Sequence, residues 1–207
     1  MVDVGCNGRV SDAGVLQETT FYRKLKNGAL AFPKHDNTVG NINFVFVADE
    51  AFALTENILK PFLRKDLTPE KQIFNYRLSR ALRCVEKAFG VLAARFLIFH
   101  TTIHVQPSKV DNIVTACVVL HNFLRRNHGT QYTPGSMLDR EDLEDASVFE
   151  GNWRNEQPQG HFDMLRRGPQ VTPATEASVN RDKYVEYFNG PRKVPFQNRM
   201  VGNRVLR

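Results

Sequence analysis

The sequence predicts an α/β fold, and three observations support this prediction. The run from Asn43 to Asp49 is rich in β-branched and aromatic residues, too short for a helix and typical of a strand buried on both faces. In two longer segments, 74–96 and 108–126, apolar residues recur every three or four positions, as they do along one face of a helix. The expected order of strand, helix, strand, long helix and helix is typical of an α/β domain rather than of a helical bundle.

The first elements are short. Residues 1–5 resemble the end of a strand, and the glycines of segment 5–8 favour a turn. A capped helix of about four turns is expected between Ser11 and Asn27, with Asp12 either a helix cap or a polar residue on the rim of an active site. Residues 31–42 are expected to form a loop, and 50–62 a short helix or turn broken at Lys60.

The long helix begins near Thr68, because Pro69 and Glu70 suit a first helical turn. Its apolar stripe consists of Phe74, Leu78, Leu82, Val85, Phe89, Leu92 and Phe96. At ~100° per residue, Glu86 lies about 90° from the centre of this stripe. The basic side chains of the same helix, Arg77, Arg80, Arg83 and Lys87, lie on its far side.

After an extended segment at 100–105, a last helix is expected from Ser108 to Arg126, with Gly129 ending it. From there on Gly, Pro, Asn, Gln and charged residues dominate, which is typical of a flexible tail. The sequence therefore predicts a core domain at 1–128 and a flexible, poorly ordered polar tail at 129–207. Within this tail, the aromatic segment 181–197 is a candidate for docking onto the domain.

Composition narrows the class of protein. A length of 207 residues suits one domain plus a tail, and a formal charge of +6 with a pI near 9.4 favours polyanionic partners such as nucleic acid. The 3 cysteines are far apart and form no Cys-x-x-Cys pair, which argues against a disulfide framework and a cysteine-rich zinc site. We expect a soluble protein of a reducing intracellular compartment, without a signal peptide or a membrane span.

Asp49 and Glu86 are the candidate catalytic and metal-binding residues. An acid that ends a strand, and a second acid between a buried and a basic helix face, are placed to meet a metal ion and a phosphate backbone together. The alternatives are that Asp49 caps the next turn and that Glu86 forms a helical ion pair with Arg83 or Lys87. A DNA backbone is the candidate partner of the basic residues Arg64, Lys65, Arg77, Arg80, Arg83 and Lys87, and a solvated helix face is the alternative.

Several stretches together resemble the PIF/Harbinger-type transposases and the nucleases derived from them. They occur in the family's order over roughly residues 2 to 127. They are Asp3-Val-Gly-Cys-Asn-Gly-Arg-Val-Ser-Asp12, Val47-Ala-Asp-Glu-Ala-Phe52, Lys60-Pro61, Phe74-Asn75, Leu78-Ser-Arg-Ala81, Val85-Glu-Lys-Ala-Phe-Gly90 and Ala116-Cys-Val-Val-Leu-His-Asn-Phe123.

This resemblance implies a ribonuclease-H-like core in which three acids hold divalent metals, Mg²⁺ or Mn²⁺, for cleavage of DNA. Asp49 matches the second acid and Glu86 the third. The family's first acid lies on a strand upstream of the segment that matches Met1, so we expect a partial fold that lacks its first two strands. The alternative function is that of a catalytically inactive remnant that binds DNA or a protein, or of a partial gene product.

The resemblance also implies partners and a location. Transposases of this type usually work with a separate Myb-like DNA-binding protein, so such a partner is expected in addition to DNA. A nuclear location follows from this expectation, with the cytoplasm as a second location.

Overall fold

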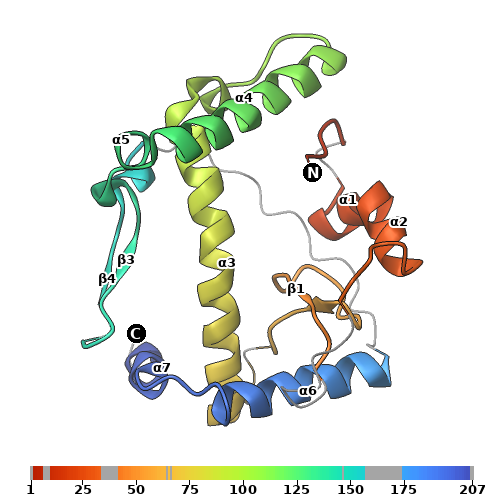
Figure 1. Ribbon diagram of the computed structural model, residues 1–207, viewed down its shortest axis with the longest axis vertical. Coiled ribbons are helices and arrows are strands. Elements are labelled where there is room, and N and C mark those ends of the chain that lie inside the picture. Colours follow the sequence, from red (N-terminus) through yellow and green to blue (C-terminus); the bar gives the residue numbers. More distant parts are fainter. Residues whose placement is uncertain are drawn as a thin grey trace. The chain divides into compact units, whose positions relative to one another are not determined.

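The computed structural model describes residues 2–6, 10–33, 42–63, 65, 67–145, 147–156 and 174–205. The chain divides into two compact units. Unit 1 consists of Met1–Asn7 and Arg83–Met164, and unit 2 consists of Gly8–Leu82 and Leu165–Arg207. The boundary falls within the long helix α3 (Pro69–Arg95), so that each unit contains part of this helix (Figure 1).

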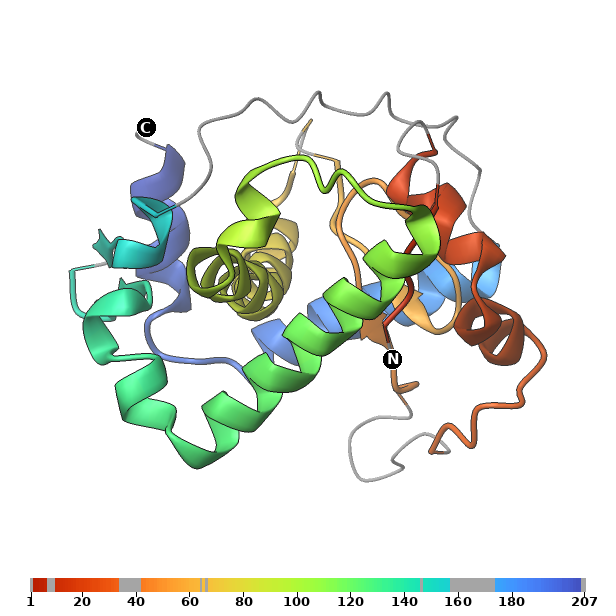
Figure 2. The ribbon, with the colours of Figure 1, turned by 90° about the horizontal axis from the view of Figure 1, so that it is seen from above.

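Unit 2 begins with two short helices where one longer helix was expected. These are α1 (Asp12–Glu18) and α2 (Thr20–Lys26), the two short coils at the start of the chain in Figure 2. Thr19 separates them because its backbone is extended, and its hydroxyl donates to the Leu16 carbonyl while accepting from the Tyr22 N–H. The predicted start is confirmed, but the prediction that Asp12 is the helix cap is wrong. The cap is Ser11, whose side chain accepts from the Gly14 N–H, and Asp12 lies in the first turn of α1.

The strands of unit 2 are shorter than predicted, and one of them was not expected. β1 (Phe46–Val47) pairs in parallel with β2 (Ile58–Leu59), with Phe46 opposite Ile58. The prediction that this strand is buried on both faces is wrong. Phe44 and Phe46 remain 43% and 40% exposed, because the core lies on the other face of the strand, beside Val45 and Val47.

The core of unit 2 joins residues that are far apart in the sequence. Its buried members are Leu54, Leu59, Phe74, Leu78 and Ala177. Ala177 belongs to α6 (Thr175–Asn189), from which Tyr184, Val185 and Phe188 also pack against this core. Thus α6 helps to cover β2 and the first half of α3.

Unit 1 continues with the second half of α3 and then η2 (Leu97–His100) and α4 (Pro107–Asn127). Figure 2 looks nearly along the axis of α3, and α4 crosses this axis. The start of α3 and the extent of α4 agree with the sequence within one or two residues. Gly129 does not lie outside helical structure, however, because it begins the short helix α5 (Gly129–Tyr132) directly after His128. Residues 100–105, expected to be extended, begin with the end of η2.

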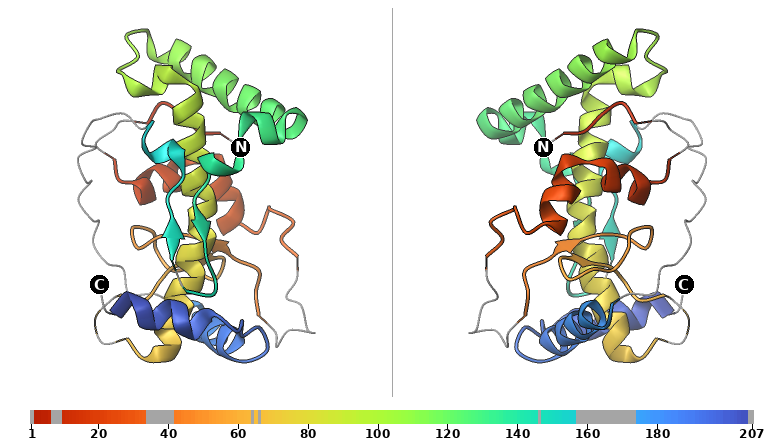
Figure 3. Two further views of the ribbon diagram at one scale, coloured as in Figure 1. Left: turned by 90° about the vertical axis from the view of Figure 1, so that its left-hand side faces the viewer. Right: turned by 90° about the vertical axis from the view of Figure 1, so that its right-hand side faces the viewer.

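Further along unit 1, η3 (Gly135–Met137) leads into β3 (Arg140–Glu141), which pairs antiparallel with β4 (Val148–Phe149), and η4 (Asn152–Arg154) follows. Figure 3 shows these two strands side by side. The core of this unit consists of Val91, Ala94, Tyr132, Met137 and Trp153.

The predicted apolar stripe of α3 is buried only in part. Phe74, Leu78 and Leu92 are buried, whereas Val85 and Phe89 are 51% and 65% exposed. The helical period is therefore right, but the middle of the stripe has no covering element among the described residues.

The region after 129, for which the composition predicts a flexible tail, contains regular structure in its described parts. Besides α5 and the β3–β4 pair it has α6 and α7 (Gln197–Val205). The boundary at 128 does not coincide with the division into units. The helix-rich fold with its parallel strand pair is compatible with the α/β class, while the ribonuclease-H-like arrangement stays a prediction. In the described part of the chain no helix is long and apolar enough to cross a membrane.

Candidate active site

Asp49 lies just beyond the carboxyl end of β1, as the sequence predicts. Because β1 and β2 are parallel, their carboxyl ends meet at the same edge, and Lys60 follows β2 directly there. Open α/β sheets bind ligands beyond the carboxyl ends of their strands. The edge that holds Asp49 and Lys60 is thus the candidate site of unit 2.

Hydrogen bonds within the following turn orient the Asp49 carboxylate. The carboxylate Oδ1 accepts from the Ala51 N–H at 2.8 Å, and the backbone carbonyl of Asp49 accepts from the Phe52 N–H at 3.4 Å. This is the turn-capping geometry that the sequence offered as an alternative. It does not use Oδ2, so turn capping and metal binding by Asp49 are compatible.

Lys60 ties the same turn to the end of β2. Its Nζ donates to the carbonyl of Phe52 at 2.9 Å and to that of Glu50 at 3.2 Å. Burial lowers the pKa of Lys60, and the nearby charge of Arg181 lowers it further, while Glu50 and Asp49 act in the opposite direction. The edge therefore has a partly desolvated cation next to its acid.

Glu86 lies on the part of α3 that belongs to unit 1, where its side chain is exposed. Its negative charge contributes to raising the pKa of Arg154, after the larger effect of Asp139. The ion pair expected as the alternative, with Arg83 or Lys87, is not the arrangement seen. Arg83 instead pairs with Glu141 at 3.1 Å, and Lys87 donates to the Asp139 carbonyl at 2.7 Å.

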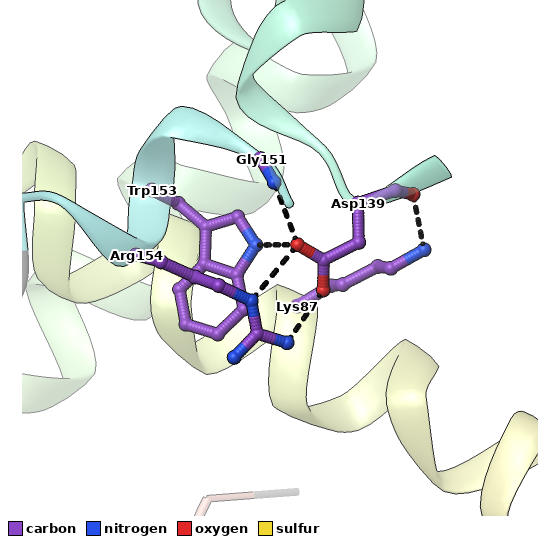
Figure 4. A network of polar contacts seen from close by, with 5 residues as sticks. All are labelled: Lys87, Asp139, Gly151, Trp153 and Arg154. Carbon is purple, nitrogen blue, oxygen red and sulfur yellow. Dashed lines mark hydrogen bonds and ion pairs between the residues drawn. The ribbon is translucent and has the colours of Figure 1, made fainter. Parts of the chain in front are cut away.

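A buried acid that sequence reasoning missed organises the surroundings of Lys87 (Figure 4). Asp139 accepts from Arg154 through both of its oxygens, at 3.0 and 2.8 Å. It also accepts from the Gly151 N–H at 2.8 Å and from the Trp153 indole N–H at 3.2 Å. Burial alone would raise the pKa of Asp139, but the hydrogen bonds from Arg154 and Gly151 and the charges of Arg154 and Lys87 hold this pKa below its ordinary value. The network fixes the chain that packs on this part of α3.

Two of the predicted DNA-contacting cations lie in unit 2 against aromatic rings. The Arg77 guanidinium is 4.8 Å from the ring centroid of Phe188, and it donates to the Arg192 carbonyl at 3.2 Å. The Arg80 guanidinium is 4.8 Å from the ring centroid of Phe196. Burial lowers the pKa of Arg77. The cations thus also hold the segment between α6 and α7 against α3.

The other predicted DNA contacts differ in their surroundings. Arg83 and Lys87 make the contacts in unit 1 given above. Lys65 is exposed, and Arg64 lies outside the described residues. DNA contact by these side chains stays a prediction.

The chemistry of Asp49 and Glu86 suits a hard divalent cation, because carboxylate oxygens are the ligands that Mg²⁺ and Mn²⁺ prefer. Asp49 retains Oδ2 outside its turn, and Glu86 is exposed. Asp49 belongs to unit 2 and Glu86 to unit 1, and the contacts that orient each acid come from its own unit. Within the ranges that the structure describes, there is no group of three or more His, Cys, Asp or Glu side chains able to hold a metal.

Sequence reasoning named Lys60 only as a break and as part of the Lys60-Pro61 stretch of the family resemblance, and it did not single out Arg181 or Asp139. No signal marked Lys60 as the end of a strand, because two apolar residues are too few to show the period of a strand. For Arg181 and Asp139 there was none, because their partners are distant in the sequence and hydrophobic periodicity carries no information on them.

One of the comparisons with known proteins identifies a family. A family model described as DDE superfamily endonuclease matches residues 1–122, which is more than half of the chain and includes both Asp49 and Glu86. No curated protein and no solved structure matches the chain.

Proposed function

This chain belongs to the DDE superfamily endonuclease family, and on that premise we propose that it cleaves phosphodiester bonds of DNA in a reaction that depends on a divalent metal. Asp49 and Glu86 are the carboxylates of this reaction. Within the family, the motifs quoted above support a nuclease of the PIF/Harbinger transposase type.

The observation that carries the proposal is the family match across both acids. The position of Asp49 supports it, because the carboxyl edge of a parallel strand pair is where such folds place reacting groups. Its hydrogen-bonded turn holds the carboxylate in one orientation before any ligand binds.

Asp49 and Glu86 would hold the metal, Mg²⁺ or Mn²⁺. A bound divalent ion supplies activation of the attacking water or hydroxyl and neutralisation of the leaving oxygen. The chain's own contribution is to orient Asp49 through Ala51 and Lys60, and to present Glu86 on a rigid helix.

Basic side chains are the proposed contacts to the DNA backbone, which binds cations by releasing condensed counterions. They are Arg64, Lys65, Arg77, Arg80, Arg83 and Lys87. Those on α3 also contact protein groups, so phosphate would compete with or add to these contacts. The motif resemblance further supports a Myb-like partner protein and a nuclear location as parts of this proposal.

One observation favours a second function, that of a DNA- or protein-binding module without catalysis. In the described ranges no three metal-ligating side chains come together. Two carboxylates alone would bind a divalent metal weakly and cleave DNA poorly.

Calorimetric titration of Mn²⁺ with plasmid nicking on the same samples distinguishes the two functions. We expect the wild type to bind Mn²⁺ and to nick DNA, the double variant Asp49→Asn/Glu86→Gln to do neither, and Glu18→Gln, which neutralises an exposed acid of α1, to match the wild type. Nicking that persists in the double variant would contradict the role of the two acids. A wild type that binds DNA but neither binds metal nor nicks would establish the second function.

A further inference from the structure

The edge beside Asp49 holds two cations to which the proposed function assigns no contact with DNA. Lys60 comes from the end of β2 and Arg181 from α6. An ammonium has three N–H donors, and the carbonyls of Glu50 and Phe52 accept from Lys60 Nζ in the turn that follows Asp49. This pair of contacts leaves one donor for a ligand.

Arg181 reaches the same edge by stacking on an aromatic ring. Its guanidinium lies 3.8 Å from the ring centroid of Phe62, two residues after Lys60. The backbone of Phe62 is itself fixed, because its N–H and its carbonyl both bond to the Asn75 amide at 2.8 Å. Stacking uses the flat face of a guanidinium and leaves the N–H groups at its edge available to an anion.

The Arg181 Nε is buried and has no hydrogen-bond partner among the described residues. A buried N–H of a charged group is costly to leave without an acceptor. A ligand oxygen at this position would remove that cost.

Arg181 and Lys60 also lie close enough for the charge of one to affect the other. Burial lowers the pKa of Arg181, which Asp182 opposes, and the charge of Arg181 adds to burial in lowering the pKa of Lys60. Two like charges are therefore held near each other and partly removed from water. The facing acids are Asp49 and Glu50 at Lys60, and Asp182 at Arg181.

We propose that Lys60 and Arg181 form a subsite beside Asp49 that binds one backbone phosphate of the DNA strand. A phosphate fits because the planar edge of a guanidinium matches two of its oxygens, while an ammonium adds a point charge. The choice of DNA as the source of this phosphate rests on the proposed function. Arg181 lies beyond the residues 1–122 that match the family model, so this part of the subsite belongs to the chain's own C-terminal region.

The test is filter binding of the full chain to a short DNA duplex in EDTA, over a series of KCl concentrations. The variants are Lys60→Met and Arg181→Gln, and the matched control is Lys26→Gln, which removes one exposed charge from α2. We expect each subsite variant to reduce the slope of log affinity against log salt by about 0.9 and to weaken binding about threefold to tenfold. The control should follow the wild type.

Unchanged slopes and affinities in folded Arg181→Gln would overturn the proposal. If Lys60→Met does not fold because its turn is released, Arg181→Gln and Arg181→Lys decide the matter. Arg181→Lys, which keeps the charge, should retain the slope that Arg181→Gln loses. A wild-type measurement adds to these: inorganic phosphate should raise the melting temperature above that in chloride of equal ionic strength, and no rise would count against the subsite.

The two proposals fail in distinguishable ways, because this binding needs no metal. Loss of nicking in Asp49→Asn with unchanged salt slopes in the Arg181 variants would leave the nuclease and remove the subsite. Reduced slopes together with a wild type that does not nick would leave the subsite on a non-catalytic module.

Discussion

Arg154 Nη2 lies 2.8 Å from Asp139 Oδ2, in an ion pair whose acid side chain is only 3% exposed. The backbone N–H of Gly151 and the Trp153 indole fill further acceptor positions of the same carboxylate. Removing a buried acid that is paired and hydrogen-bonded destabilises a protein mainly because the donors that it satisfied are left without an acceptor.

Asp139→Ala should therefore lower the free energy of unfolding by about 2–4 kcal/mol, because several donors lose their acceptor at once. The value falls short of that for a fully buried pair, since Arg154 remains partly exposed. Urea unfolding followed by far-UV circular dichroism measures it. Glu18→Gln, on the exposed surface of α1, should stay within about 0.5 kcal/mol of the wild type, and a similarly small effect at Asp139 would contradict the network.

The contribution of Asp139 should also depend on pH. Its folded-state pKa is lowered from the ordinary value of 3.8, so the folded protein binds fewer protons than the unfolded chain. The stabilisation is present above that value and is lost as the pH falls through the folded pKa. The difference in unfolding free energy between wild type and Asp139→Asn should hold from pH 7 to about pH 5 and shrink below about pH 4. A difference that grows on acidification would contradict the sign of the shift.

Gly90→Ala should destabilise the protein, although alanine is the better helix former. A Cβ at this position would overlap the Trp153 indole, so the ring or the helix must move. We expect a loss of about 1–3 kcal/mol in thermal or urea unfolding. Gly129→Ala is the control, since no atom lies within 4 Å of a Cβ there. Equal effects of the two substitutions would show that close packing at Gly90 is unimportant.

Thr19→Ala should cost about 1 kcal/mol, because one hydroxyl caps both α1 and α2. Thr20→Ala is a neighbouring control whose hydroxyl only accepts an exposed contact from Arg23. Urea unfolding compares them. A larger loss of unfolding free energy in Thr20→Ala than in Thr19→Ala would contradict a stabilising role of the Thr19 hydroxyl.

Local signals predicted the parts of the fold that depend on local chemistry. α1 begins directly after Ser11, Pro69 starts α3, and α4 follows its apolar period. The break at Thr19 escaped prediction because threonine is tolerated in helices and acts as a cap only when the chain turns there. The strand β2 escaped because two residues are too few to show a period of two.

The same distinction applies to the candidate site. Asp49 was predicted because an acid that ends an apolar strand is visible in the sequence. The approach of Arg181 to Phe62 and its effect on Lys60 were not predicted, since only the packing of α6 on the core brings Arg181 to Phe62. The exposure of Val85 and Phe89 was equally hidden, because periodicity marks an apolar face but not what covers it.

The burial of Trp153 has a spectroscopic consequence. It is the only tryptophan of the chain, and it packs against Val91, Ala94 and Met137 in the core of unit 1. Its emission on selective excitation therefore reports on unit 1 alone, and should shift to the red when that core opens to water. If unit 2 unfolds on its own, circular dichroism will register a transition that leaves the emission of Trp153 unchanged. Comparing the two optical signals would thus show whether the halves of this chain melt together.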